Sequence, residues 1–181
     1  YDRDNTGTGS SSIFLIPWNP YMIDLHTHTR ASDGSFTPVE LVRHAADKGL
    51  SVLAVTDHDT IGGLTEAAAA AADAGLIFIP GIELDISWTP GDCHLLGYGV
   101  GRKDSAIDTL LETINGNRRK RNVLILEALR EKGFDIDLER VEAAAGGGTV
   151  GRPHIARYLT STGAVKSVQQ AFDKYLATGR P

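Results

Sequence analysis

The sequence predicts an α/β protein built on a parallel β-sheet. From Met22 onward, short apolar segments alternate with segments of helical pattern. The apolar segments are continuous, and polar residues do not alternate with them, which is typical of parallel strands that helices cover on their faces. Beyond Val100 the strand-like segments stop and helical patterns follow one another. These observations predict a part with a sheet, followed by a smaller helical part.

The first elements have recognisable beginnings and ends. Residues 22–28 and the valine-rich residues 51–56 are predicted to be strands. A helix is predicted over residues 37–48, because threonine and proline open it and a glycine follows directly after it. The alanine-rich residues 60–74 are predicted to form a second helix that ends at Gly75.

Three further strands are predicted before residue 101. Residues 76–80 form another short apolar segment. Residues 83–88 and 94–100 are predicted to pair with each other, because the sequence Thr-Pro-Gly-Asp at residues 89–92 is typical of a turn. The strand order along the chain therefore ends with a hairpin.

The remainder of the chain is predicted to be helical. Val123, Leu126 and Leu129 give one apolar stripe at helical spacing, and three glycines at residues 146–148 indicate a loop. We therefore expect a small helical insertion or subdomain. Its predicted helices cover residues 105–115, 118–132, 138–145, 153–162 and 168–176.

Composition restricts the class of protein. The net charge of -5 argues against a protein that coats nucleic acid without specificity. No apolar stretch of the sequence is long enough to span a bilayer. The single cysteine excludes an intramolecular disulfide, and we expect a cytoplasmic protein. Motifs of serine nucleophiles, phosphate-binding P-loops and dinucleotide-binding loops are absent from the sequence.

Short clusters of histidine and carboxylate residues follow the predicted strands. In the first cluster, His26 and His28 lie two residues apart on a predicted strand, so both side chains should point to the same face. Two imidazoles aimed at one point indicate a metal site, whereas the simpler interpretation is a pair of half-buried, hydrogen-bonded histidines. Asp33 follows in a Ser-Asp-Gly loop and is predicted to be a further ligand, with an Asx turn as the alternative.

The second cluster is Thr-Asp-His-Asp at residues 56–59. His58 is assigned as a metal ligand because it lies at the end of a predicted strand. Asp57 is predicted to lie behind the ligands and to orient an imidazole. Asp59 either belongs to the site or caps the N-terminus of the following helix.

Glu83 and His94 form the third cluster. Glu83 comes directly after a long apolar run, and an ionised glutamate next to so much apolar surface needs a partner. A metal ion is the most direct partner, and a carboxylate can bridge two of them. His94 begins the next predicted strand and is assigned as a ligand too.

Gly-Arg-Pro-His at residues 151–154 is the last informative motif. Proline in the first turn opens a helix, and the free N–H groups of a helix N-terminus bind phosphate. Arg152 is predicted to bind phosphate and His154 to bind either metal or phosphate, with an ordinary helix start as the alternative. Arg118 belongs to the basic run at residues 118–121, which is either a solvated helix face or a path for an oligonucleotide backbone.

In this order, the motifs resemble the PHP-domain (polymerase and histidinol phosphatase) metallophosphoesterases, from Met22 to the end of the chain. The motif at residues 151–154 resembles one subgroup, the stand-alone 3′,5′-nucleoside bisphosphate phosphatases and 5′-to-3′ exoribonucleases of short RNA. The segments that carry the resemblance are Asp-Leu-His-x-His at 24–28, Ser-Asp-Gly at 32–34, Thr-Asp-His-Asp at 56–59, Gly-Ile-Glu at 81–83 and His-Leu-Leu-Gly-Tyr at 94–98.

The resemblance implies an irregular (β/α)7 TIM-like barrel with its metals at the carboxyl ends of the strands. Residues 22–103 would form the first part of the barrel and residues 104–178 a helical insertion. Residues 1–21 are expected to be a disordered extension before a natural start at Met22. Three or four βα units do not close a barrel, and the family's late Asp-x-His motif is absent after His154. We therefore expect a C-terminally truncated chain, with the rest of the barrel beyond residue 181.

The resemblance also implies two or three divalent metal ions. Mixed imidazole and carboxylate ligands suit Mn, Zn or Fe better than Mg or Ca, and the subgroup favours Mn²⁺. The implied ligand sets are His26, His28 and Glu83 for one metal, Asp33 and His58 for a second, and Glu83, His94 and His154 for a third.

The function implied is hydrolysis of a phosphate ester of a nucleotide or of short RNA, with a metal-activated water as the attacking group. Arg152 and the helix start beside it would hold the phosphate that is not cleaved, and Arg118 would also contact substrate. No obligate protein partner is expected. The alternatives are a phosphatase of another small ester such as histidinol phosphate, an inactive metal-binding fragment, and a PHP module of a DNA polymerase.

Overall fold

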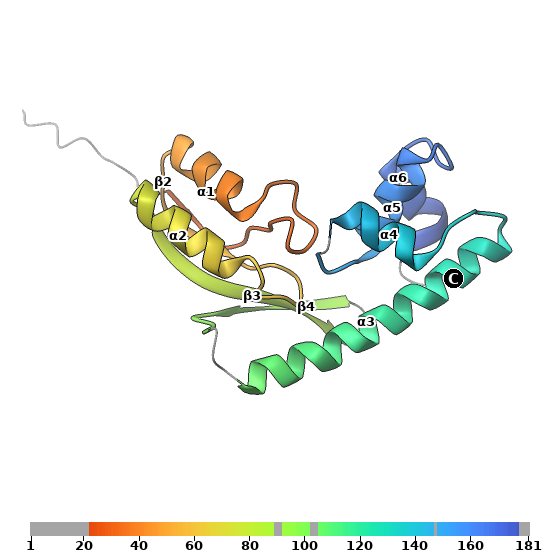
Figure 1. Ribbon diagram of the computed structural model, residues 1–181, viewed down its shortest axis with the longest axis horizontal. Helices are drawn as coiled ribbons and strands as arrows, with labels where there is room; N and C mark the ends of the chain where they lie inside the picture. The colour runs from red at the N-terminus through yellow and green to blue at the C-terminus, as the bar shows by residue number, and fades with distance from the viewer. Residues whose placement is uncertain (1–21, 89–91, 102–104, 147, 178–181) are drawn as a thin grey trace, which may run out of the picture.

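The computed structural model describes residues 22–88, 92–101, 105–146 and 148–177. Its strands form one curled sheet in the order β1-β2-β3-β4 (Figure 1). The pairs β1–β2 and β2–β3 are parallel, whereas β3 and β4 pair in an antiparallel hairpin. The strand bounds are Met22–Asp24, Leu50–Val55, Ile77–Ser87 and Asp92–Tyr98.

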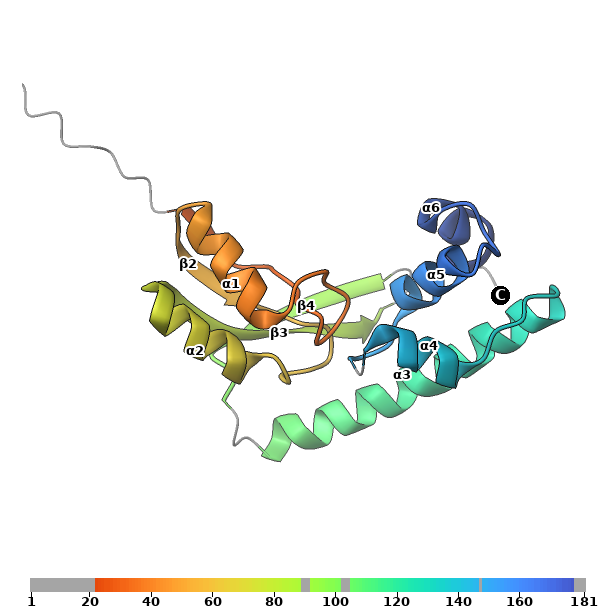
Figure 2. The same cartoon turned by 45° about the horizontal axis from the view of Figure 1, so that its top comes forward.

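Two helices cover one face of this sheet. Helix α1 spans Pro38–Asp47 and α2 spans Leu64–Ala74, and the two lie side by side in both views (Figures 1 and 2). Their apolar faces meet β2 in a core that includes Val42, Leu53 and Ala67. Full burial of a valine or leucine side chain stabilises the fold by roughly 1.5–3 kcal/mol. The parallel strands are therefore held by the helices that connect them.

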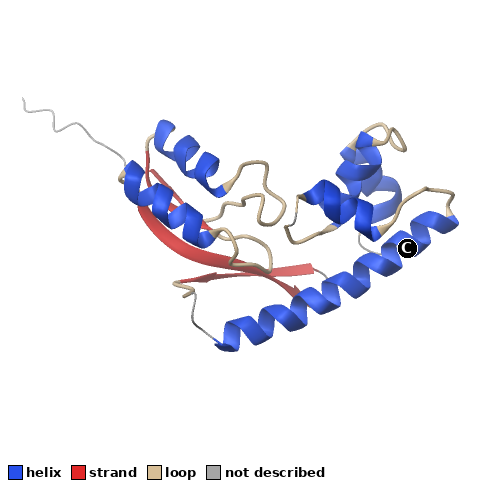
Figure 3. Cartoon of the chain, viewed as in Figure 1, coloured by secondary structure: helices blue, strands red, loops and turns tan. Residues whose placement is uncertain are grey.

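The rest of the described chain is helical. Helix α3 begins beneath β3 and β4 and extends along the shorter helices (Figure 3). Near its start, Leu111 packs with Ile82 of β3, and further along Leu126 and Leu129 join the apolar core of the helical part. The helical bounds are Ser105–Glu131 for α3, Leu138–Ala145 for α4, Arg152–Ser161 for α5, Val168–Ala171 for α6 and Phe172–Leu176 for the π-helical turn η1.

The structure confirms the α/β prediction and corrects several bounds. Strand β1 ends at Asp24, so the segment predicted as strand to residue 28 continues as a loop. The strands predicted over 76–80 and 83–88 are the single strand β3, which pairs with β2 through its first half and with β4 through its second half. The helices predicted over 105–115 and 118–132 are the single helix α3.

Helix α3 continues through Gly116 because nothing in its surroundings requires a break there. A glycine inside a helix costs only about 1 kcal/mol relative to alanine, which the packing of a long helix offsets. The caps predicted for α1 are present: Thr37 accepts from the backbone of Glu40, and Gly49 has a positive φ of 79° just past the helix. The predicted extension at residues 1–21 and most of the predicted turn at 89–92 lie outside the described residues.

Among the helices that the structure describes, none combines the length and the apolar character needed to cross a bilayer.

Gly81 lies where β3 passes from its parallel to its antiparallel partner. A Cβ atom built there would lie 3.0 Å from the carbonyl oxygen of Gly97 and 3.1 Å from that of Val55, and backbone atoms cannot move aside cheaply. We predict that Gly81→Ala lowers the free energy of unfolding by about 1–3 kcal/mol, measured by urea denaturation.

The matched control for this substitution is Gly116→Ala in α3, where an added Cβ meets no atom within 4 Å. This variant should be neutral or gain up to about 1 kcal/mol. Equal effects of the two substitutions would contradict the crowding described at Gly81.

Candidate metal centre

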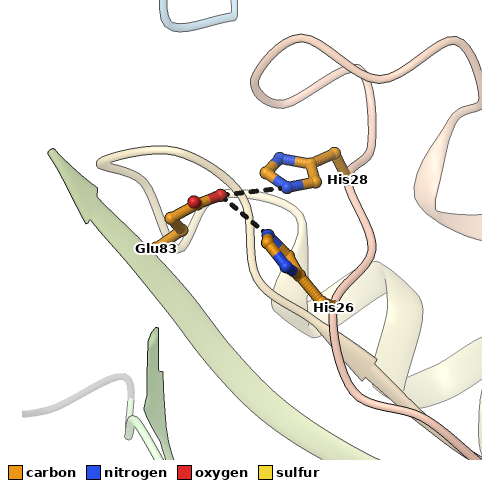
Figure 4. A group of neighbouring side chains, drawn as sticks. All are labelled: His26, His28 and Glu83. Atoms are coloured by element: carbon orange, nitrogen blue, oxygen red, sulfur yellow. Dashed lines mark hydrogen bonds and ion pairs between the residues drawn. The ribbon is translucent and has the colours of Figure 1, made fainter. Parts of the chain in front are cut away.

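The loop that follows β1 carries the first two histidines. Thr27 lies between them and ties this loop to β2: its hydroxyl donates to Ala54 O at 2.6 Å, and its carbonyl accepts from Thr56 N at 2.9 Å. With the threonine fixed against the sheet, His26 and His28 both turn toward β3, where Figure 4 shows their rings facing one carboxylate. The sequence analysis expected a strand to point both imidazoles to one face. In the structure a loop that is tied to β2 brings them together instead.

That carboxylate belongs to Glu83, which is only 2% exposed. Its Oε2 atom lies 3.0 Å from Nε2 of His26, 3.0 Å from Nε2 of His28 and 3.4 Å from Nε2 of His58. Its Oε1 atom lies 2.7 Å from Nδ1 of His94. Four imidazoles from three segments of the chain therefore converge on one buried anion.

Asp33 approaches the same centre from the loop before α1. Its Oδ1 atom lies 3.3 Å from Nδ1 of His28. Gly34 beside it is packed against the backbone, since an added Cβ would lie 2.2 Å from the carbonyl oxygen of His28. The loop can place the Asp33 carboxylate here because residue 34 has no side chain.

Asp57 holds this loop, and its predicted role of orienting an imidazole stays a prediction. Its two carboxylate oxygens accept from the backbone N–H of Thr29, from the hydroxyl of Thr29 and from the hydroxyl of Ser32, each at 2.6 Å. Asp57 is buried, so its charge needs several donors, and the loop supplies them. Its effect on the histidines is indirect, because Ser32 lies 3.5 Å from the ring of His28.

The donor atoms form three overlapping groups, in each of which all of them lie within 4.8 Å of one another. Donors that share one tetrahedral metal at about 2.1 Å lie about 3.4 Å apart, so the distances of 3.0–3.4 Å to Glu83 Oε2 fit a metal centre. The groups are His26, His28 and Glu83; His28, Asp33 and His58; and His58, Glu83 and His94.

The first group is the predicted one, and the second contains the predicted Asp33 and His58 together with His28. In the third group His58 takes the place predicted for His154. Among the described residues, His154 belongs to none of the three groups. Its Nδ1 atom instead accepts from the backbone N–H of Gly151 at 3.1 Å, which satisfies the start of α5. Burial lowers the pKa of His154, and the nearby Arg157 adds to this effect.

The imidazoles and carboxylates of the centre shift one another's pKa values toward the charged forms. Contact with His28 lowers the pKa of Asp33 to about 2, although burial acts against it. Burial also acts to raise the pKa of Glu83, yet the surrounding imidazoles lower it overall. Contact with His58 holds the pKa of Asp85 well below its usual range. For His58, burial opposes a charge, but Asp85 and Glu83 raise its pKa overall. The carboxylates are therefore anionic at neutral pH, as metal ligands must be.

Asp85 is a member of the site that the sequence analysis did not single out. It lies on β3 two residues after Glu83, and its Oδ1 atom lies 3.3 Å from Nδ1 of His58 and 3.4 Å from Nε2 of His94. Its other oxygen accepts from Arg118 at 2.6 Å. The spacing of two residues on a strand was the available signal, because it places both carboxylates on one face.

Of the two alternatives predicted for Asp59, the structure contradicts only the helix cap, and Arg118 pairs with this residue. Asp59 does not cap α2, whose N-cap residue is Gly63; it is fully buried with a φ of 51°. Arg118, predicted to contact substrate, forms ion pairs with both Asp59 and Asp85. With 9% of its side chain exposed, its guanidinium is committed to those two carboxylates.

A cleft of about 720 Å³ opens between the sheet and the helical part. His58, Asp85 and His94 line it from the sheet, and Arg121 and Arg152 line it from the helices. The helical part also contacts the loop that carries Asp33: Thr149 N donates to Ala31 O at 3.0 Å, and Arg157 donates to Asp33 O at 2.6 Å. The predicted phosphate-binding Arg152 thus lies across a cleft from the metal-ligand groups.

A family model described as "PHP domain" matches residues 24–176 of the chain. The chain is 38% identical over 167 residues to a 3′,5′-nucleoside bisphosphate phosphatase of Chromobacterium violaceum, an alignment that covers 88% of this chain and 56% of the relative. It is 39% identical over 157 residues to a 5′-3′ exoribonuclease of Haemophilus influenzae, covering 87% of this chain and 57% of the relative. The chain therefore spans about half the length of these curated relatives.

The fold of the chain also matches a solved structure. A protein from Bifidobacterium adolescentis, described as a metal-dependent phosphoesterase, superimposes with a TM-score of 0.81 at 30% sequence identity. The superposition covers 88% of this chain and 57% of that one. The order of strands and helices described above is thus shared with an experimentally determined structure.

Glu83, like His28 and His58, belongs to two of the three ligand groups, so its loss should weaken metal binding in both. We predict that Glu83→Gln lowers the affinity for Mn²⁺ or Zn²⁺ by more than about 100-fold, measured by equilibrium dialysis with metal analysis. Glu66→Gln on the exposed surface of α2 is the matched control and should bind metal like the unmodified protein. Retention of full affinity by Glu83→Gln would rule out the ligand groups described.

Proposed function

The chain belongs to the PHP domain family, and on this basis we propose that it is a metal-dependent hydrolase of phosphate esters in nucleotides. The proposed substrates are 3′,5′-nucleoside bisphosphates and short RNA with a 5′-phosphate. The names of the curated relatives in Chromobacterium violaceum and Haemophilus influenzae support this substrate class. The observation that carries the proposal is the convergence of four imidazoles on the buried Glu83 carboxylate.

The proposed cofactor is a set of two or three divalent metal ions, with Mn²⁺ as the proposed metal and Zn²⁺ or Fe²⁺ as alternatives. The donor set of imidazoles and carboxylates suits these metals better than Mg²⁺ or Ca²⁺. When bound, such metals supply positive charge to phosphate oxygens and make water a stronger nucleophile at neutral pH. We assign His26, His28, Asp33, His58, Glu83 and His94 as their ligands.

The cleft offers the second requirement of the proposed substrate, a place for a phosphate that is not cleaved. Arg152 opens α5, and the first N–H groups of a helix favour anions. Arg121 lines the same cleft, and its Nε atom is buried without a hydrogen-bond partner. Desolvation and the neighbouring Arg118 and Arg152 lower the pKa of Arg121. A phosphate between Arg121 and Arg152 would offset this repulsion.

Within this proposal the residues have separate tasks. The histidine and carboxylate ligands hold the reacting phosphate near the metals, and the two arginines fix the distance to the second phosphate. Arg118 pairs with the two aspartates and also lines the cleft, where its contact with substrate stays a prediction. His154 is assigned to the start of α5, where it helps to position Arg152.

We further propose that residues 22–103 form the first part of a PHP barrel and residues 104–178 a helical insertion. Exposed apolar side chains on β1 and β3 support this proposal: Met22, Ile23 and Ile77 are 45–62% exposed, as expected of strands that another part of a barrel would cover. The cytoplasm is the proposed location, and a nucleotide or RNA is the proposed partner.

Two other functions are compatible with a metal centre of this kind. A phosphatase of another small ester, such as histidinol phosphate, would use the ligands in the same way, but would not need the arginine pair across the cleft. A metal-binding fragment without turnover would bind metal and nucleotide and release no phosphate. The experiment below separates these functions.

The proposed activity is tested by Mn²⁺-dependent phosphate release from adenosine 3′,5′-bisphosphate. The unmodified protein should release phosphate, and His26→Ala should reduce the rate by at least about 100-fold, because a ligand of the first group is lost. The matched control is His44→Ala on the exposed side of α1, which should keep the full rate. Retention of the rate by His26→Ala would contradict the proposed site.

The outcome for other substrates decides between the functions. Release from histidinol phosphate at a higher kcat/KM than from the bisphosphate would overturn the nucleotide assignment. Tight Mn²⁺ binding without release from any of these esters or from 5′-phosphorylated oligonucleotides would overturn the assignment as an enzyme.

A further inference from the structure

Asp85 has contacts that its place in the sequence does not explain. It follows Glu83 by two residues on β3, so both side chains lie on the same face of the strand. The backbone N–H of Asp85 donates to Asp59 Oδ1 at 3.1 Å, so the main chain is fixed at this point. A fixed carboxylate next to a metal-ligand group has either a coordinating or a positioning role.

The rings of His58 and His94 each lie between Glu83 and Asp85. His58 turns Nε2 toward Glu83 at 3.4 Å and Nδ1 toward Asp85 at 3.3 Å. His94 has the reverse order, with Nδ1 toward Glu83 at 2.7 Å and Nε2 toward Asp85 at 3.4 Å. Each ring therefore presents one nitrogen to the ligand group and the other nitrogen to the Asp85 carboxylate.

The two atoms that face each other between His58 and Asp85 are buried. Nδ1 of His58 and Oδ1 of Asp85 lie beyond the reach of solvent and make no hydrogen bond of good geometry in the described residues. A buried donor and a buried acceptor left apart cost about 1–3 kcal/mol each. The two atoms are already 3.3 Å apart, so a small rotation of the ring that aligns the N–H with the carboxylate oxygen is favourable.

Asp85 is held from its far side by α3. Arg118 donates to Asp85 Oδ2 at 2.6 Å and also pairs with Asp59, while Arg121 lies 3.9 Å from the same Asp85 oxygen. The side chain of Asp85 is thus anchored by the helical part through Oδ2, and its Oδ1 atom faces the two histidines of the sheet. An imidazole that donates one N–H to a fixed carboxylate has its tautomer set, and its other nitrogen is a better metal ligand.

We propose that Asp85 is a positioning residue of the metal centre, which accepts an N–H from both His58 and His94 and so aims their other nitrogens at the metals, with Arg118 as its anchor. The inference rests on the metal centre of the proposed function. It assigns to Asp85 the role that the sequence had suggested for Asp57.

A consequence for the ligand groups follows. If Nδ1 of His58 carries the proton that Asp85 accepts, only Nε2 remains as a ligand atom. His58 then serves one metal, although it belongs to two of the three groups. The helical part also acquires a role in the metal centre, because its Arg118 keeps Asp85 in place.

The tautomers are measured directly on the unmodified protein loaded with Zn²⁺, which is diamagnetic. Two-bond ¹⁵N–¹H correlation spectra should show the proton of His58 on Nδ1 and that of His94 on Nε2, assigned with His58→Gln and His94→Gln. The proposal is overturned if zinc binds Nδ1 of His58 or Nε2 of His94, because Asp85 would then be a ligand itself or have no role.

Zinc affinity tests whether Asp85 strengthens metal binding. Asp85→Asn and Asp85→Ala should weaken zinc binding by about 10- to 100-fold in competition with a chromophoric chelator. Asp73→Asn on the exposed side of α2 is the control and should bind zinc unchanged. Thermal unfolding of the metal-free proteins checks that each variant is folded.

Unchanged zinc affinity in both Asp85 variants would overturn the positioning role, even if the tautomers agree. These readouts do not depend on turnover. A protein that shows the expected tautomers and affinities but releases no phosphate would contradict the proposed function and leave the role of Asp85 standing.

Discussion

The buried carboxylate of Glu83 is the constraint on which the rest of the site depends. Removing an ionised carboxylate from water is costly unless positive charge and hydrogen-bond donors replace the water. Here the replacements are imidazoles from the loop after β1, the end of β2 and the start of β4. Imidazoles can lose their protons to accept a metal, so the arrangement that stabilises the anion also favours divalent cations.

The fold supplies this arrangement through local features of each segment. Thr27 fixes the loop of His26 and His28 against β2, Asp57 holds the loop that carries Asp33, and the long β3 carries Glu83 beyond the end of β2. Helix α3 then closes the site from the other side, where Arg118 forms ion pairs with Asp59 and Asp85. The contacts of Asp57 and Arg118 are hydrogen bonds and ion pairs of buried or nearly buried polar groups, which makes the geometry specific.

The sequence predicted the residues that come together around Glu83 better than the residues that support them. Histidines and carboxylates after apolar segments are visible in a one-dimensional pattern, so His26, Glu83 and their neighbours could be named. The partners of Asp57 and Arg118 could not, because Thr29 and Asp85 are 28 and 33 residues away and only the packing of the loops and α3 brings them together. The sequence analysis divided β3 into two strands, because proline and glycine at residues 80 and 81 are typical of a strand end. Only the structure shows that β3 changes its pairing partner at this point.

The central claim is that Glu83 lies at the heart of a metal centre and not merely in a buried cluster of histidines. Anomalous diffraction from crystals of the Mn²⁺-loaded protein tests it most directly. The account predicts manganese peaks in contact with the Glu83 carboxylate, one of them also bound by His26 and His28. Peaks confined to other parts of the molecule, or a Glu83 that contacts only imidazoles at saturating Mn²⁺, would contradict it.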